Sequence, residues 1–179
     1  MTKLHIFRIT LISILLTVTS QLAANELPGY RLAADDEISM SVFGEPELSI
    51  RKTLIAINGN ISVPLIGQVN LKNLTTSEAE EHIKKRFSGG YLINPAISIS
   101  IIKYRQFYVN GEVKNPGGYN YRDGMNVQKA VTLAGGFSER ADKDDITIAH
   151  ENSTDSPEKA TITDTILPGD IVTIDESFF

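Results

Sequence analysis

The chain has 179 residues, of which 41% are hydrophobic and 22% are charged, and its formal net charge is −5. This composition is typical of a globular protein and excludes a disordered chain or one that crosses a membrane many times. The sequence contains no cysteine. That excludes disulfide scaffolds, cysteine-based zinc sites, cysteine nucleophiles and a lipid anchor on an N-terminal cysteine.

Residues 1–24 have the layout of a secretory signal peptide. Lys3 and Arg8 are followed by an uncharged, leucine- and isoleucine-rich stretch, and Ala23 and Ala24 offer small residues for cleavage. The apolar run is shorter than the roughly 20 residues that a spanning helix needs, so we expect cleavage and release into a bacterial periplasm. Removing the two basic residues of this segment leaves 15 basic and 22 acidic side chains, a net charge of −7. Such a surface does not favour nucleic acid.

The mature chain is expected to form two small α+β modules, and the first opens with strands. Alternating polar and apolar residues predict strands over 37–42 and 97–101. Two apolar-rich runs, 53–57 and 61–65, are separated by Asn58-Gly59, a pair that strongly indicates a hairpin. Pro64 indicates an edge position for the second run, and Gly67 is expected to end it.

A helix is predicted between Thr75 and Gly89-Gly90. Thr75 and Glu78 have the spacing of a capping box, acidic residues fill the first turns and basic residues the last. An apolar stripe at four-residue spacing consists of Ala79, Ile83 and Phe87. The two glycines supply the C-terminal stop.

The second module begins without an obvious linker. Strands are expected over 107–113, 146–148, 160–166 and 171–174. Asn126 is expected to cap a short helix that Gly135-Gly136 ends. Turns are expected at 115–118 and 167–170, because each combines proline with glycine. A polar stretch over 151–159 is expected to be a loop.

Residues that could carry chemistry are few. His82 and His150 lack ligand spacing to another histidine. The acidic clusters 35–37 and 142–145 are interpreted as solvated or capping groups in turns, and they lack the spacing of an EF-hand. The sequence contains no phosphate-binding loop and no nucleophile motif. We therefore expect no catalytic residue, no metal site and no cofactor. An enzyme that trims polysaccharide through Asp35, Asp36 or Glu37 stays open as an alternative.

The order of turns and helices is similar to that of the bacterial polysaccharide biosynthesis/export proteins. Segments 29–32, 38–49, 58–69, 74–87 and 91–99 resemble the N-terminal export domain of that family. Segments 109–117, 130–136 and 167–174 resemble its SLBB domain, a soluble ligand-binding β-grasp module. The turn residues that carry the resemblance are Asn58, Gly59, Pro64, Gly67, Gly111, Pro116, Gly117, Gly135, Gly136, Pro168, Gly169 and Asp170. The resemblance implies domains over 25–103 and 104–179 and an α+β fold.

The resemblance also implies a function and partners. Copies would assemble into a ring and act as a non-catalytic part of a conduit for capsule polysaccharide or exopolysaccharide. The expected partners are the polysaccharide chain, an inner-membrane polysaccharide copolymerase and an outer-membrane β-barrel. The sequence departs from the family pattern in three ways: Ala34-Asp35-Asp36 replaces a Pro-Gly-Asp turn, no lipid-modified cysteine follows the signal, and no C-terminal amphipathic helix follows the last strand. These departures point to the short, periplasmic type, which is not a lipoprotein.

Basic and aromatic residues near strand ends are candidate contacts for polymer or partner. They are Arg51, Lys52, Lys103, Tyr104 and Arg105. The plainer interpretation is that these are solvated strand ends. A soluble periplasmic oligosaccharide-binding or sensing protein is the alternative function, in which Tyr104, Phe107, Tyr108, Tyr119 and Tyr121 would stack on sugar rings. We favour a role in the core or in strand pairing for most of these aromatic residues.

Overall fold

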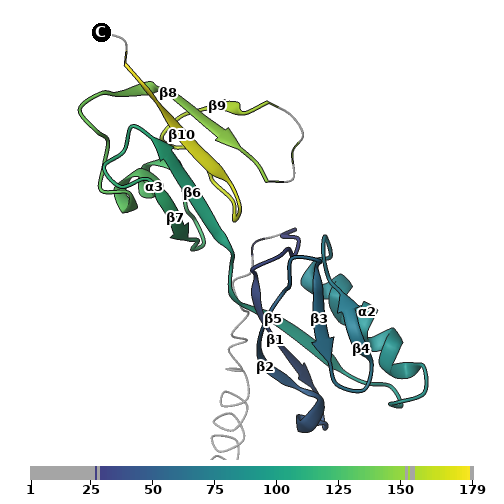
Figure 1. The fold of residues 1–179 in the computed structure, drawn as a ribbon. Helices are drawn as coiled ribbons and strands as arrows, with labels where there is room; N and C mark the ends of the chain where they lie inside the picture. The colour runs from purple at the N-terminus through teal and green to yellow at the C-terminus, as the bar shows by residue number, and fades with distance from the viewer. Residues whose placement is uncertain (1–26, 28, 152, 154–155, 178–179) are drawn as a thin grey trace, which may run out of the picture.

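The computed structural model describes residues 27, 29–151, 153 and 156–177. The expected signal segment, with Ala23 and Ala24, lies outside the described residues. The chain forms an N-terminal module, which contains β1 to β5, and a C-terminal module, which contains β6 to β10 (Figure 1). Each module has its own hydrophobic core, and the predicted α+β class is confirmed. In the described part of the chain, no helix has the length and apolarity needed to cross a membrane.

The N-terminal module consists of an antiparallel sheet covered by a helix and a separate hairpin. The sheet has the order β2-β1-β5, with β1 at Glu37–Val42, β2 at Ile50–Leu54 and β5 at Ile97–Lys103. A single 3₁₀ turn, η1 (Pro46–Leu48), connects β1 to β2. The hairpin consists of β3 (Asn60–Val63) and β4 (Gly67–Asn70).

Helix α2 (Thr76–Ser88) forms as the sequence predicts. The Thr75 hydroxyl accepts from the backbone N–H of Glu78, and the Glu78 carboxylate accepts from the backbone N–H of Thr75, so both halves of the capping box are present. The predicted apolar stripe is fully buried in the core of the N-terminal module. Because the cap and the stripe act within one or two turns, they specify the helix locally.

The predicted hairpin at Asn58-Gly59 is wrong. Residues 56–59 do form a tight turn, in which the Gly59 N–H donates to the Ala56 carbonyl at 2.7 Å. The strands on its two sides separate, however, because β2 pairs with β1 and β3 pairs with β4. The hairpin turn instead lies between Val63 and Gly67 and contains Pro64. Buried Ile61 and Val69 stand opposite each other in this hairpin and add to the core, which explains the choice of partner.

The C-terminal module is a mixed five-stranded sheet with one short helix. The strand order is β7-β6-β10-β8-β9, and only the central β6–β10 pair is parallel. The strands are β6 (Gln106–Gly111), β7 (Gly117–Asn120), β8 (Ala141–Ala149), β9 (Glu158–Ala160) and β10 (Ile171–Glu176). Helix α3 (Val127–Leu133) buries Val127, Ala130 and Val131 in the core, and the Asn126 side chain caps it as predicted.

Three strand predictions in this module need correction. Strand β7 was not predicted, and it begins at Gly117, within the expected turn over 115–118. The acidic cluster 142–145 lies within β8 and not in a turn. The predicted strand over 160–166 ends at Ala160, because the Asp164 carboxylate accepts from the Thr161 N–H at 2.7 Å and closes a turn.

Candidate functional site

Two turns of the same construction lie where the modules meet. In the first, the Asp36 Oδ2 atom accepts from the Ala33 N–H at 2.9 Å. In the second, the Asp170 Oδ2 atom accepts from the Leu167 N–H at 2.7 Å. Each turn leads directly into a strand, β1 in one module and β10 in the other. We call Ala33–Asp36 and Leu167–Asp170 the two Asp turns.

The residue before each aspartate has a left-handed backbone. Gly169 has φ +90°, and a Cβ on it would lie 2.2 Å from the Glu151 Oε2 atom and 2.7 Å from the Arg105 Nε atom. Asp35 takes the equivalent position with φ +66°. Aspartate tolerates this conformation better than most non-glycine residues. The first Asp turn therefore has the same construction as the second, although it reads Ala-Asp-Asp where the second reads Pro-Gly-Asp.

Arg105 joins the two modules from the centre of this junction. Its backbone N–H donates to Asp36 Oδ1 at 2.9 Å, and its Nη1 atom lies 3.5 Å from Asp36 Oδ2. Its Nε atom donates to Glu151 Oε2 at 2.5 Å, and Nη1 donates to the Tyr30 hydroxyl. The Arg105 side chain is only 8% exposed and Asp36 is fully buried. Asp36 caps a turn, as the sequence indicated, but it is not solvated.

Three tyrosine rings pack beside this charge pair. The Tyr104 ring meets the Tyr30 ring edge to face, with centroids 4.9 Å apart, and the Tyr121 ring at 5.5 Å. The Tyr30 hydroxyl donates to Asp36 at 2.7 Å. Tyr104 and Tyr121 therefore fill the junction, and Phe107 is fully buried in the core. Of the five candidate stacking residues, Tyr108 is the most exposed, at 46%.

Burial shifts the pKa values of the junction carboxyls. Desolvation raises the pKa of Asp36, and hydrogen bonds from the Ala33 N–H and the Tyr30 hydroxyl, together with the Arg105 charge, act against it. Desolvation likewise raises the pKa of Asp170, against the Leu167 N–H and His150. The His150 Nδ1 atom lies 2.9 Å from Asp170 Oδ1. His150 is thus a junction residue with a structural partner. In the described part of the chain, no group of three or more histidine, aspartate or glutamate residues could hold a metal ion.

Replacing Tyr121 with phenylalanine is expected to stabilise the protein. The residue is 4% exposed, and among the described residues its hydroxyl has no hydrogen-bond partner, so we expect a gain of about 1 kcal/mol in the free energy of unfolding. Burial raises the pKa of Tyr121 to about 12. Between pH 10 and 12 the folded state therefore binds more protons than the unfolded state, and stability falls as pH rises.

Urea unfolding of wild type and Tyr121→Phe at pH 7 and above pH 10 measures both effects. The difference in the free energy of unfolding between the variant and the wild type should be larger at the higher pH. The reason is that phenylalanine has no hydroxyl to ionise, so the variant escapes the loss of stability that Tyr121 causes in the wild type. Tyr108→Phe is the control, since that ring is partly exposed. A loss of stability in Tyr121→Phe at pH 7 would show that the hydroxyl has a partner after all.

The structure separates the five candidate contact residues. Arg51, Lys52 and Lys103 are exposed on strands of the N-terminal module. Lys52 forms an ion pair with Glu37, and Lys103 stands opposite Glu37 in the β1–β5 register. Tyr104 and Arg105 belong to the junction, and the burial of Arg105 corrects its expected role as a surface contact. A buried side chain that binds Asp36, Glu151 and Tyr30 is not available to a partner.

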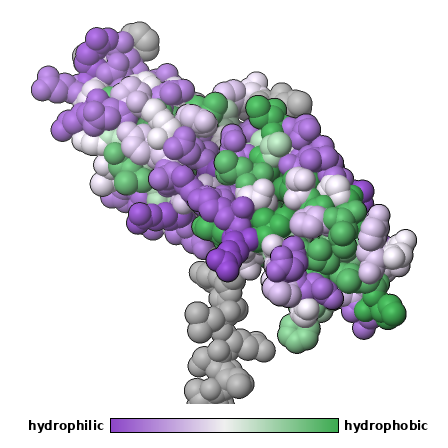
Figure 2. All heavy atoms as spheres, turned by 60° about the horizontal axis from the view of Figure 1, so that its bottom comes forward, coloured by the Kyte–Doolittle hydropathy of each residue, from purple (hydrophilic) through white to green (hydrophobic). Residues whose placement is uncertain are grey.

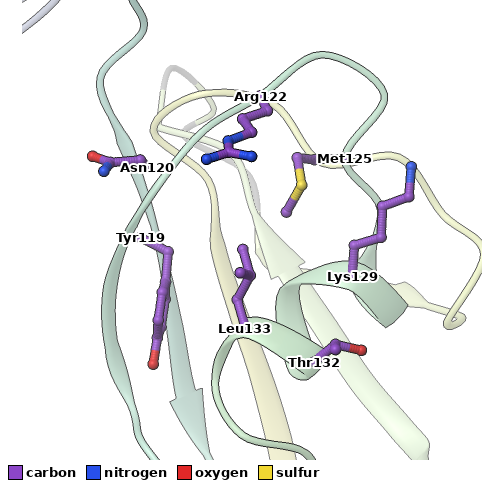
Figure 3. Close-up of a pocket in the computed structure, with 7 residues that line it drawn as sticks. All are labelled: Tyr119, Asn120, Arg122, Met125, Lys129, Thr132 and Leu133. Carbon is purple, nitrogen blue, oxygen red and sulfur yellow. The ribbon is translucent and has the colours of Figure 1, made fainter.

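Sequence reasoning missed a pocket on the C-terminal module (Figure 3). This β7–α3 pocket has a cavity volume of about 460 Å³ and is lined by Tyr119, Asn120, Arg122, Met125, Lys129, Thr132 and Leu133. These residues come from β7, the loop after it and α3. Because β7 carried no sequence signal, nothing in the sequence placed Tyr119 beside α3.

Comparisons with known proteins identify both modules. Residues 24–102 match the family model described as polysaccharide biosynthesis/export protein, and residues 106–158 match the SLBB domain. The exopolysaccharide production protein ExoF of Rhizobium meliloti (strain 1021) is 39% identical over 87 residues, which are 48% of this chain and 20% of ExoF.

Two further relatives match over a longer part of the chain. They are the EPS I polysaccharide export outer membrane proteins EpsA of Ralstonia solanacearum and of Ralstonia nicotianae (strain ATCC BAA-1114 / GMI1000). The first is 25% identical over 143 residues, which are 66% of this chain and 37% of EpsA. The second is 25% identical over 134 residues, 61% of this chain and 35% of EpsA. The chain thus spans between a fifth and little more than a third of these relatives' lengths.

Proposed function

By these two domains the chain belongs to the polysaccharide biosynthesis/export protein family, and we propose that it is a non-catalytic, ring-forming component of a periplasmic conduit for exopolysaccharide or capsule polysaccharide. Its partners would be an inner-membrane polysaccharide copolymerase on one side and an outer-membrane β-barrel on the other. The observation that carries the proposal is the pairing of the export domain with the SLBB domain in one chain. The names of ExoF and EpsA, which refer to exopolysaccharide production and export, support it.

The module junction suits a conduit component. A ring keeps its geometry only if each subunit holds its two modules at a fixed angle. The buried Arg105–Asp36 pair, the hydrogen bond from Arg105 to the Tyr30 hydroxyl and the packing of Tyr104 on Tyr30 tie the modules together through groups from both sides. Asp36 is buried and bound by Arg105 and Tyr30. These contacts support a structural and not a catalytic role for Asp36.

Exposed apolar side chains on the N-terminal module are candidate contacts between subunits or with partners. Phe43 and Ile93, in loops of the N-terminal module, are 86% and 101% exposed, and Ile57 is 88% exposed. In Figure 2 apolar side chains gather over the N-terminal module, whereas the visible face of the C-terminal module is mostly hydrophilic. Exposed apolar patches of this kind, where several large side chains gather on one face, are typical of interaction surfaces. We assign Arg51, Lys52 and Lys103 to the same group of proposed contacts.

A clean, non-polar deletion of the gene tests this function. We expect surface polysaccharide to disappear and to return when the intact gene is supplied in trans. The native mass of the purified complex then tests the ring. Surface polymer that is unchanged in amount and length, in a strain without a paralogue, would overturn the conduit role.

The β7–α3 pocket favours a second candidate, a soluble periplasmic protein that binds or senses oligosaccharide. Ligand pockets in proteins combine an apolar lining with a few polar groups, as this one does. A protein that stays monomeric and binds oligosaccharide at micromolar affinity, while its deletion leaves export intact, would support this candidate over the conduit.

A further inference from the structure

The β7–α3 pocket has an apolar wall and a charged rim. Tyr119 is half-buried, Met125 is buried and Leu133 is exposed, and all three present apolar surface to the cavity. In Figure 3 the Arg122 guanidinium and the Lys129 ammonium lie on opposite sides of Met125. Asp123, the acidic neighbour of Arg122, does not line the pocket. The cavity therefore pairs an apolar surface with two cations and no lining carboxylate.

Most polar groups of this pocket are held by the fold. The Tyr119 hydroxyl donates to the Asn115 carbonyl, and the Thr132 hydroxyl donates to the Gln128 carbonyl at 2.8 Å. The Lys129 Nζ atom donates to the Gly124 carbonyl at 2.6 Å, which fixes the ammonium and leaves its other N–H groups free. Across the part of the chain that the structure describes, the Arg122 guanidinium has no hydrogen bond or ion pair in the fold, so its whole donor fork is open to a ligand.

We infer that this pocket binds an acidic sugar unit, one that carries a carboxylate on its ring, of the polymer that the protein serves. This inference rests on the proposed function for the source of the ligand, but the chemistry comes from the pocket. A guanidinium binds a carboxylate through two parallel N–H···O bonds, and a nearby ammonium adds a second charge. The apolar face of a pyranose ring can lie against Tyr119 and Leu133.

The pocket also gives this binding a role in transport. The chain as a whole is acidic, with a net charge of −5, and would repel an acidic polymer at long range. The two cations of the pocket would attract the carboxylates of the polymer at one place on each subunit. Because these cations lie on an exposed rim, salt weakens the attraction. Contacts of this kind hold a polymer transiently and release it, as passage through a conduit requires.

Titration of the ¹⁵N-labelled, purified full chain with trigalacturonate, maltotriose and acetate tests the inference by NMR. We expect trigalacturonate to shift amide signals of residues 119–133, and maltotriose and acetate to bind much more weakly. Arg122→Gln should weaken trigalacturonate binding about tenfold, since it removes a charge-assisted pair. Arg140→Gln is the matched control, because Arg140 is also an exposed arginine of the C-terminal module but does not line the pocket.

Each alternative result has a defined meaning. Equal binding of maltotriose, equal binding of acetate, unchanged affinity in Arg122→Gln, or shifts confined to the N-terminal module would each overturn the inference. If trigalacturonate fails to bind while the deletion strain loses its surface polymer, the inference fails and the proposed function stands. If binding occurs as expected while the deletion strain exports normally, the pocket assignment stands and the conduit role fails.

Discussion

Replacing Arg105 with alanine is expected to lower the free energy of unfolding by about 3–5 kcal/mol, the usual cost of breaking a buried ion pair from one side. The change leaves the fully buried Asp36 without its cationic partner, and it also removes the hydrogen bond that Arg105 Nε donates to Glu151. Because Arg105 connects the two modules, we also expect the wild type to unfold by urea in a single transition and the variant to unfold in two.

The pH dependence of the stability lost in Arg105→Ala provides a second readout. The guanidinium lowers the pKa of Asp36 against the effect of burial, so its loss leaves the folded-state pKa higher than in the wild type. The folded variant then binds a proton at a pH where the folded wild type does not. The stability difference should therefore shrink as pH falls and grow as pH rises.

Arg51→Ala is the matched control for Arg105→Ala. Arg51 is an exposed arginine on β2, and its loss should change stability by less than about 0.5 kcal/mol. If Arg105→Ala unfolds in one transition and within that same range of the wild type, the buried pair does not hold the modules together.

Replacing Gly111 with alanine is expected to disrupt the centre of the C-terminal sheet. Gly111 ends β6 with φ +78°, and a Cβ on it would lie 2.0 Å from the Ile174 carbonyl oxygen. That oxygen belongs to the parallel β6–β10 pair and accepts from the Glu112 N–H at 2.9 Å. The backbone strain alone costs about 1–2 kcal/mol. Because the clash is with backbone, β10 must also move, and we expect a total loss above about 3 kcal/mol.

Gly67→Ala separates the strain from the clash. Gly67 has φ +73°, close to that of Gly111, but nothing lies within 4 Å of a Cβ added there. Thermal unfolding of the two variants should therefore show a much larger drop in Tm for Gly111→Ala. An equal decrease in Tm for the two variants would mean that β10 shifts at little energetic cost. The close approach of β6 and β10 at Gly111 would then not constrain the sheet.

The sequence by itself determined the helices of this protein. The capping box of Thr75 and Glu78, the stripe that includes Phe87, and the Asn126 cap all act between residues a few positions apart, and the structure contains each of them. The pattern of strands, helices and turns also indicated two α+β modules, and the order of turns and helices resembled that of the export family. These signals are readable because helix hydrogen bonds and caps connect near neighbours in the chain.

Strand pairing was decided only by the tertiary structure. The Asn58-Gly59 turn formed, but β3 paired with β4 because that arrangement buries Ile61 and Val69 together. Strand β7 was invisible in the sequence because its four residues, Gly117–Asn120, show no apolar alternation and pair with β6 from across a turn. Pairing depends on which distant segment completes a core, and a local pattern does not contain that information.

The junction and the pocket also form only when segments that are distant in the sequence pack together. The sequence marks Asp36, Arg105 and Asp170 as ordinary polar residues of turns and strand ends, and it gives no sign that they meet. Their burial follows from the docking of two modules, which removes water from charges that the separate segments would leave solvated. The β7–α3 pocket likewise needs a strand and a helix packed side by side. The sequence thus determined the helices, the export and SLBB domains and the absence of cysteine chemistry, whereas only the fold decided which charges are buried and that Arg122 lines the β7–α3 pocket.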